Sequence, residues 1–105
     1  MPSEISKRYY SISEVATLLD EATSVLRYWE REFEQLRPAT NSKGDRRYVA
    51  SDIEKLKQIH QLVRQEGYTI EGAKQAFAKA QQRETQRQQI LKFLQKTRQR
   101  LEKMI

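Results

Sequence analysis

The sequence predicts a mainly α-helical fold: a winged helix-turn-helix with a small β-hairpin wing and a C-terminal coiled-coil helix. Three observations predict it. Two short amphipathic stretches are separated by only a few residues, a basic polar turn lies between short extended stretches, and an apolar stripe with heptad spacing ends the chain. The 105 residues allow one domain and an appended element. We expect the domain to span residues 1–80 and a dimerisation helix to span residues 81–105.

Composition restricts the class of protein. The hydrophobic fraction is 37%, no run approaches the length of a membrane span, and the N-terminus lacks an apolar export signal. We therefore expect a soluble cytoplasmic protein that has no membrane partner. The chain has no cysteine and one histidine, so neither a disulfide nor a metal site is expected, and no cofactor is indicated.

The net charge of +6 is unevenly distributed. Residues 1–80 carry 13 Lys and Arg against 12 Asp and Glu, whereas residues 81–105 carry 7 against 2. Residues 37–47 form a second basic patch, with four cations and Asp45 as the only acid. Such patches favour a nucleic-acid partner, although membranes and acidic proteins attract them as well.

The first helix is expected to begin after Ser11. The stretch Met1–Arg8 is predicted to be a frayed polar start, and Tyr9-Tyr10 a short extended piece. Ser11 and Glu14 have the spacing of a capping box, in which each side chain binds the other's free backbone N–H. The apolar residues that this helix would bury are Ile12, Val15, Ala16 and Leu19.

The second amphipathic stretch covers residues 24–33, after a short break at residues 20–23. Its large apolar residues recur at helical spacing and are predicted to be buried: Leu26, Trp29 and Phe33. The side chains expected to face outward are Arg27, Tyr28 and Arg31. Guanidinium and phenol groups on a rigid helix suit base edges and phosphate oxygens. The alternative is an ordinary amphipathic helix with a solvated charged face.

A basic hairpin is predicted next. Residues 36–39 and 46–49 would form two strands around a polar turn at residues 40–45. Pro38 suits an edge strand, and the turn holds residues that tolerate positive φ. A hairpin this short needs support from the helices. Behind a helix-turn-helix it would be a wing; the alternative is a plain solvated loop. The basic residues of this predicted hairpin, from its first strand to its second, are Arg37, Lys43, Arg46 and Arg47.

Two further helices are predicted after the hairpin. Ser51 and Glu54 have capping-box spacing and would open a helix that ends at Gly67, and Thr69 would cap the next, short helix. The inward-facing residues would be Ile53, Leu56, Ile59 or His60, Val63, Ile70, Ala73, Ala76 and Phe77. No cysteine or carboxylate cluster accompanies His60, so a place at the edge of the core is expected rather than metal binding.

The last segment is rich in Gln, Arg and Lys and carries an apolar stripe. Residues at alternating spacings of four and three form about two heptads of a coiled-coil seam: Ile90, Leu94, Thr97, Leu101 and Met104. Leu91 and Ile105 widen the stripe. A helix of this length with one apolar face needs a partner. The alternatives are a helix that folds back on its own domain and a disordered basic tail.

From Tyr10 to about Ala80 the chain resembles the MerR family of bacterial winged helix-turn-helix regulators. Four motifs occur in the family's order and spacing: Ile12-Ser13-Glu14-Val15-Ala16, Leu26-Arg27-Tyr28-Trp29-Glu30, Gly44-Asp45-Arg46-Arg47-Tyr48 and Gly67-Tyr68-Thr69-Ile70-Glu71. The resemblance implies that Arg27 and Tyr28 contact the DNA backbone or base edges, that Arg46 reaches phosphates, and that Ser13 lies near the backbone. It also implies an antiparallel coiled coil between two subunits and RNA polymerase as a further partner.

Other residues join the candidate DNA-binding set on position or charge. Thr23 and Ser24 lie at the N-terminal end of the second helix, where recognition helices usually contact bases. Lys43 and Arg47 are wing cations. We expect Trp29 and Tyr48 to serve in packing instead.

The turn between the first two helices departs from the family pattern. The family usually has a glycine, an apolar residue and a Ser or Asn cap, and this chain has Asp20, Glu21 and Ala22. Asp tolerates the left-handed conformation less well than Gly, and Ala is a poor cap. Thr23 could cap instead, and Glu21 would place a negative charge near DNA.

The predicted function is a sequence-specific transcriptional regulator that binds double-stranded DNA at a pseudo-palindromic promoter site as a homodimer. One alternative is an architectural or excisionase-like protein that bends or coats DNA, and another is a protein-interaction module. The chain has no cysteine, one histidine, no Gly-rich phosphate loop and no paired carboxylates on a shared apolar wall, so no enzyme is expected. No small-molecule effector is expected within this chain. The operator, the sign of regulation and the signal do not follow from the sequence.

Overall fold

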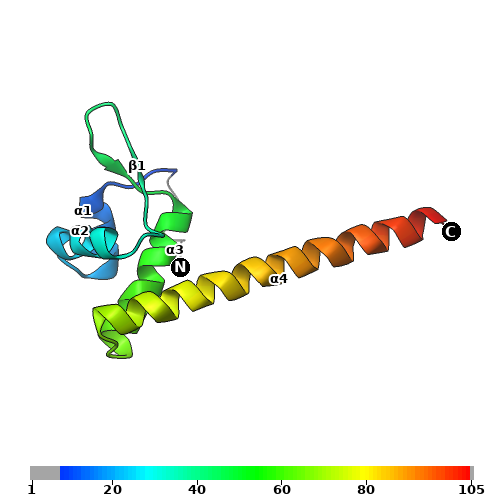
Figure 1. The fold of residues 1–105 in the computed structure, drawn as a ribbon. Helices are drawn as coiled ribbons and strands as arrows, with labels where there is room; N and C mark the ends of the chain where they lie inside the picture. Colours follow the sequence, from blue (N-terminus) through cyan, green and yellow to red (C-terminus); the bar gives the residue numbers. More distant parts are fainter. Residues whose placement is uncertain (1–7, 105) are drawn as a thin grey trace. The chain divides into compact units, whose positions relative to one another are not determined.

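The computed structural model describes residues 8–104 (Figure 1). It contains the helices α1 (Ile12–Leu19), α2 (Thr23–Glu32), α3 (Ala50–His60) and α4 (Ile70–Met104), the π-helical turn η1 (Gln61–Gln65), and the strands β1 (Ala39–Thr40) and β2 (Arg46–Arg47). A mostly helical chain with one small antiparallel hairpin and a long C-terminal helix confirms the predicted fold class. Most of the predicted frayed start, residues 1–7, and Ile105 lie outside the described residues.

The chain divides into two compact units between Lys74 and Gln75. The first unit holds α1, α2, α3, η1, the hairpin and the first residues of α4, and the second holds the rest of α4. The predicted domain boundary at residue 80 stays a prediction.

The capping box at the start of α1 is confirmed. The Glu14 N–H donates to Ser11 Oγ at 3.2 Å, and the Ser11 N–H donates to Glu14 Oε1 at 3.1 Å. The helix ends at Leu19, and Asp20 adopts the left-handed conformation with φ of 54°. Ala22 is the N-cap of α2 without a side-chain hydrogen bond, so a cap at Thr23 was wrong: Thr23 is already the first helical residue.

The predicted core of the second helix is confirmed. Leu26, Trp29 and Phe33 are each at most 1% exposed, whereas Arg27, Tyr28 and Arg31 are exposed. Burial of three large side chains fixes the rotation of α2 about its axis, so the outward residues have defined positions. In the first unit they pack with further buried residues: Tyr10, Val15, Ala16, Leu19, Leu36, Tyr48, Ile53, Leu56, Ile59 and Ala73.

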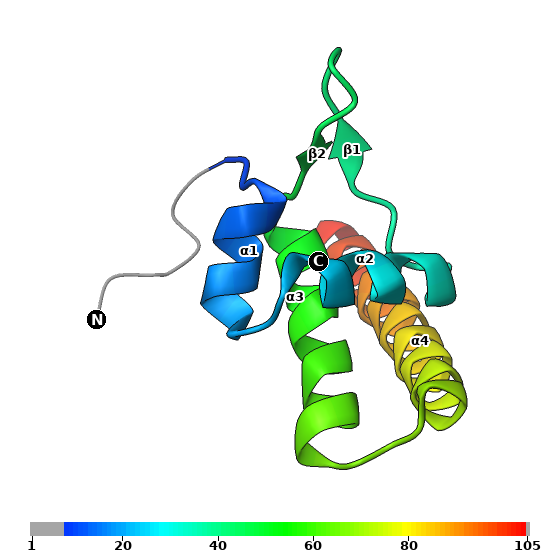
Figure 2. The same ribbon diagram turned by 90° about the vertical axis from the view of Figure 1, so that its left-hand side faces the viewer.

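The hairpin, residues 39–47, is called the wing from here on. Ala39 pairs with Arg47 and Thr40 with Arg46, so each strand is only two residues long, shorter than predicted. Leu36 was expected in the first strand but is buried in the core, which keeps it out of the hairpin. The wing extends away from α1 and α2 (Figure 2).

The turn of the wing is held by one side chain. Asn41 Oδ1 accepts hydrogen bonds from the N–H groups of Lys43 and Asp45, both at 2.9 Å, and Gly44 supplies the positive φ of 84°. Beyond the wing, Tyr10 and Tyr48 exchange two backbone hydrogen bonds of 2.8 Å, which confirms the predicted extended piece before α1.

The start of α3 corrects a second prediction. The helix begins at Ala50 after Val49, and Asp52 Oδ2 accepts from the Val49 N–H at 3.0 Å. The predicted capping box of Ser51 and Glu54 was therefore wrong, because an acidic residue two positions earlier binds the free N–H. Thr69 does cap α4, since its hydroxyl accepts from the Gly72 N–H at 3.1 Å.

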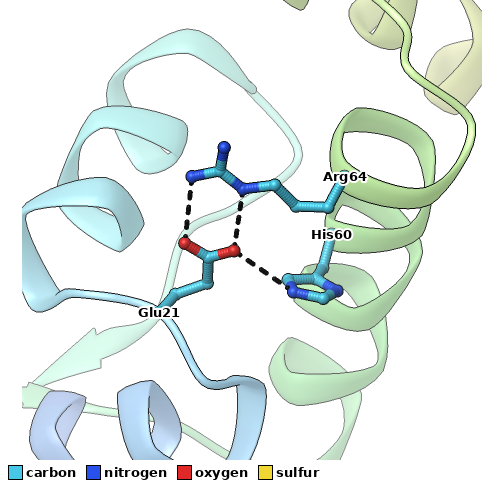
Figure 3. A network of polar contacts seen from close by, with 3 residues as sticks. All are labelled: Glu21, His60 and Arg64. Carbon is cyan, nitrogen blue, oxygen red and sulfur yellow. Dashed lines mark hydrogen bonds and ion pairs between the residues drawn. The ribbon is translucent and has the colours of Figure 1, made fainter.

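The unusual turn after α1 is tied to the end of α3 and to η1 through a polar network (Figure 3). Arg64 donates to both carboxylate oxygens of Glu21, at 2.8 and 3.0 Å, and His60 Nε2 lies 3.2 Å from Glu21 Oε2. The Glu21 side chain is only 10% exposed. Glu21 thus fastens the turn, and the Arg64 guanidinium pairs with its carboxylate.

His60 lies at the edge of the core, as predicted. Its side chain is 23% exposed, and its ring meets the Trp29 ring edge-on, with centroids 6.2 Å apart. Among the described residues, no group of His, Cys, Asp or Glu could hold a metal ion.

The helix α4 is one continuous helix of 35 residues rather than a short helix followed by a separate one. Neither Gly nor Pro occurs after Gly72, and helix-favouring Ala, Gln, Lys and Arg predominate. Its predicted seam is exposed: Ile90 59%, Leu94 55%, Leu101 58% and Met104 82%. Phe93, which the heptad pattern missed, is 67% exposed. No helix in the described part of the chain is long and apolar enough to cross a membrane.

Candidate nucleic-acid interface

A hollow of about 590 Å³ lies between the wing and the start of α1. It is lined by side chains from the segment before α1, from α1, α2 and the wing, which are far apart in sequence. Among them are four of the eight predicted DNA-binding residues: Ser13, Arg27, Arg46 and Arg47. The structure therefore gathers three arginines around one concave surface. Their positive charges suit the phosphate groups of a nucleic-acid backbone.

The other four predicted residues lie outside this hollow. Thr23 lines a second hollow along the turn between α1 and α2, and Ser13 belongs to both hollows. Ser24 and Tyr28 are exposed on α2, and Lys43 is exposed in the turn of the wing. Ser13 thus links the surface beside the wing with the N-terminal end of α2.

Tyr28 is 39% exposed, and the cationic side chain of Arg31 lies beside it. The guanidinium carbon of Arg31 lies 5.8 Å from the centre of the Tyr28 ring, within the range of a cation–π contact. The contact restrains both side chains on the exposed face of α2.

Sequence reasoning missed Glu30, which lies behind the cations. Arg46 Nε donates to Glu30 Oε1 at 2.6 Å, and the Tyr48 hydroxyl donates to the other carboxylate oxygen. The Glu30 side chain is only 9% exposed, whereas that of Arg46 is 34% exposed. The sequence places Glu30 on the same flank of a helix as Arg27, three residues earlier, but carries no signal of its contact with the wing.

The contact with Glu30 shifts the pKa values of Arg46 and Tyr48. The hydrogen bond to Glu30 raises the pKa of Arg46. Burial, followed by the hydrogen bond to Glu30, raises the pKa of the Tyr48 hydroxyl far above its ordinary value. A Tyr48 phenolate would lie unsolvated against a carboxylate, so the folded chain keeps this hydroxyl protonated.

Tyr9 is a second residue that the sequence did not single out. It is 40% exposed and lines the hollow. The guanidinium carbons of Arg8 and Arg47 lie 5.5 and 5.2 Å from the centre of its ring. The ring therefore supports Arg47 at the edge of the hollow.

Alkaline pH should destabilise the fold through Tyr48. In the unfolded chain a tyrosine ionises near pH 10, whereas the folded pKa is raised, so the contribution of Tyr48 is complete below about pH 10 and is lost as the pH rises towards the folded pKa. Above about pH 10 the free energy of unfolding of the wild type should fall about 1.4 kcal/mol per pH unit more steeply than that of Tyr48→Phe. Urea denaturation across this range measures both slopes.

The control for this experiment is Tyr28→Phe, because Tyr28 is exposed and makes no contact with Glu30. This variant keeps the contact between Tyr48 and Glu30, so its free energy of unfolding should also fall more steeply than that of Tyr48→Phe. Equal slopes for the wild type and Tyr48→Phe would show that the Tyr48 hydroxyl is not held protonated by the fold.

Comparison with known proteins gives a consistent result. The pattern of MerR HTH family regulatory proteins matches residues 10–80. Comparison with curated proteins gives no match.

Solved structures resemble the chain in fold. HiNmlR, described as a MerR family regulator lacking the sensor domain and bound to promoter DNA, superposes with a TM-score of 0.59 at 18% identity; the match covers 69% of this chain and 54% of that one. This chain therefore spans about half of that protein. A MerR family regulator from Bacillus cereus has a TM-score of 0.57 at 24% identity, with 91% and 77% covered. One from Bacillus thuringiensis has a TM-score of 0.52 at 25% identity, with 91% and 93% covered.

Proposed function

Because this chain belongs to the MerR family of helix-turn-helix regulatory proteins, we propose that it is a transcriptional regulator that binds a pseudo-palindromic promoter site as a homodimer. The observation that carries the proposal is the hollow in which Ser13, Arg27, Arg46 and Arg47 meet beside the exposed face of α2. The family is one of regulators rather than enzymes.

The contacts divide into two kinds. Arg27 and Tyr28, with Thr23 and Ser24 at the start of α2, are placed on the helix that would enter the major groove, where side chains distinguish base pairs. The wing residues Lys43, Arg46 and Arg47 would bind phosphates and fix the register, which carries no sequence information by itself. HiNmlR, a structure of similar fold, is bound to promoter DNA, which supports DNA binding by this chain.

The exposed stripe on α4 supports the homodimer. A helix with one apolar face exposed to water is marginal alone and gains stability from a partner helix. The proposed contact residues are Ile90, Leu94, Thr97, Leu101 and Met104. Basic residues flank this seam and would repel a second copy, and the ion pair between Arg98 and Glu102, at 3.1 Å, offsets part of that repulsion. Two heads related by a two-fold axis would read inverted half-sites.

The same family membership suggests action at promoters together with RNA polymerase. We propose that the dimer distorts the duplex between the polymerase contact elements, and that flexible base steps lower the energy of that distortion.

Selection of bound duplexes from a random pool, followed by sequencing, tests this function. The proposal predicts enrichment of one motif made of two inverted half-sites at fixed spacing. Cooperative arrays without a common motif would instead indicate an architectural protein that coats DNA. Failure to enrich any duplex would indicate that the basic surfaces serve a protein partner.

A further inference from the structure

We infer that Glu30 is a positioning residue of the DNA interface, which fixes the wing against α2 and sets the direction of the Arg46 guanidinium. The inference rests on the proposed DNA binding and deepens it. Glu30 itself would touch no DNA, because its side chain is only 9% exposed.

The geometry makes the wing depend on this carboxylate. Each strand of the wing has only two residues, and so short a hairpin is not stable alone. Both oxygens of Glu30 are bound from that segment, one by Arg46 at its base and the other by Tyr48 just beyond it. The backbone bridge between Tyr10 and Tyr48 ties the same segment to the start of α1. Glu30 supplies the corresponding connection to α2.

The contact also orients the cation. Only Nε–H of Arg46 donates to Glu30, at 2.6 Å. An arginine has five N–H donors in a planar group, so fixing Nε fixes the plane in which the terminal donors lie. The side chain is 34% exposed, which leaves those donors accessible to a phosphate. Arg27 is close enough for its charge to act on Tyr48, so the same cluster connects the reading helix with the wing.

A purely electrostatic effect of Glu30 and a positioning role predict opposite effects of its substitution on binding to the specific site. Replacing Glu30 by glutamine removes a negative charge behind a cationic surface, and on charge alone this should strengthen binding to any duplex. If Glu30 positions the wing, the same change should weaken binding to the specific site, because the Arg46 plane and the wing are no longer fixed. The direction of the change therefore decides between the two.

The experiment compares Glu30→Gln with Glu34→Gln in the full chain. Glu34 is exposed just after α2, and its substitution changes the net charge equally. Affinities are measured for the duplex selected from the random pool and for a scrambled duplex. Glu30→Gln should bind the selected duplex about tenfold or more weakly, the size expected when hydrogen bonds to a charged group are lost, with scrambled binding unchanged or stronger. Glu34→Gln should keep the discrimination of the wild type.

A second variant covers the case in which Glu30→Gln does not fold. Tyr48→Phe keeps the charge of Glu30 and removes one of its two hydrogen bonds. It should lower the discrimination about threefold or more and speed hydrogen exchange in the wing amides, residues 41–47. Where both variants fold, the double variant should lose little more than Glu30→Gln alone, because both act through one contact.

The outcomes separate this inference from the proposed function. If the wild type and Glu34→Gln fail to distinguish the selected duplex from the scrambled one, the proposed function is wrong and this inference fails with it. If the wild type and Glu34→Gln distinguish the two duplexes and Glu30→Gln distinguishes them equally well, Glu30 has no positioning role. Where Glu30→Gln does not fold, the same result for Tyr48→Phe leads to the same conclusion.

Discussion

Replacing Leu94 and Leu101 together by lysine should weaken binding to the selected duplex by about 10² to 10⁴-fold, the usual gain from linking two binding modules. Both side chains are more than half exposed on α4 and belong to the proposed seam. Two added cations on that seam would separate the subunits, and each head would then bind its half-site alone. Titration of a labelled duplex, with sedimentation of the free protein, measures both effects.

The matched control is Gln95→Lys with Gln99→Lys. These residues lie on the opposite side of α4 by helical spacing, and the pair adds the same charge. The control should remain a dimer and bind DNA at least as tightly as the wild type. Tight specific binding by the Leu94 and Leu101 variant would refute dimerisation through this stripe.

Arg27→Ala should weaken binding to the selected duplex by about 1–3 kcal/mol and reduce discrimination at the base pairs that Arg27 contacts. Arg27 is exposed on α2 and lines the hollow beside the wing, where Leu26 and Trp29 fix the rotation of the helix. Because Arg27 is not buried, its removal should leave the free energy of unfolding nearly unchanged. Competition assays with selected and scrambled duplexes give the two affinities.

Lys57→Ala serves as the control for lost charge. Lys57 lies on α3, outside the hollow, where its ammonium group is 3.8 Å from a Glu54 carboxylate oxygen. It should reduce specific and scrambled binding equally and slightly. If Arg27→Ala behaves in the same way, α2 is not the reading helix.

The periodic parts of the fold could be predicted from the sequence because local chemistry determines them. Leu26, Trp29 and Phe33 repeat at the helical period, and Ser11 with Glu14 forms a cap that needs only neighbouring residues. The caps of α2 and α3 could not be predicted in this way. At α3 the N-cap is Val49, two residues before the predicted Ser51, so Asp52 rather than Glu54 accepts from the free N–H.

The residues behind the interface depend on contacts between segments far apart in sequence. Glu30 binds residues 16 and 18 positions later, and Glu21 binds Arg64, 43 positions later. From the sequence alone, Glu30 belongs to a charged helix face that could simply be solvated, and Glu21 is a negative charge unfavourable to DNA binding. The exposed cations were predictable because exposure follows from helical periodicity, whereas the carboxylates that position them are recognised only once the chain has folded.

Sedimentation equilibrium of the chain with the selected duplex tests whether two copies of the chain bind one site together. In dilute salt we expect a complex of two chains on one duplex, and no such complex on the scrambled duplex at the same concentration. A chain that sediments as a monomer and leaves every duplex unbound under those conditions would contradict it.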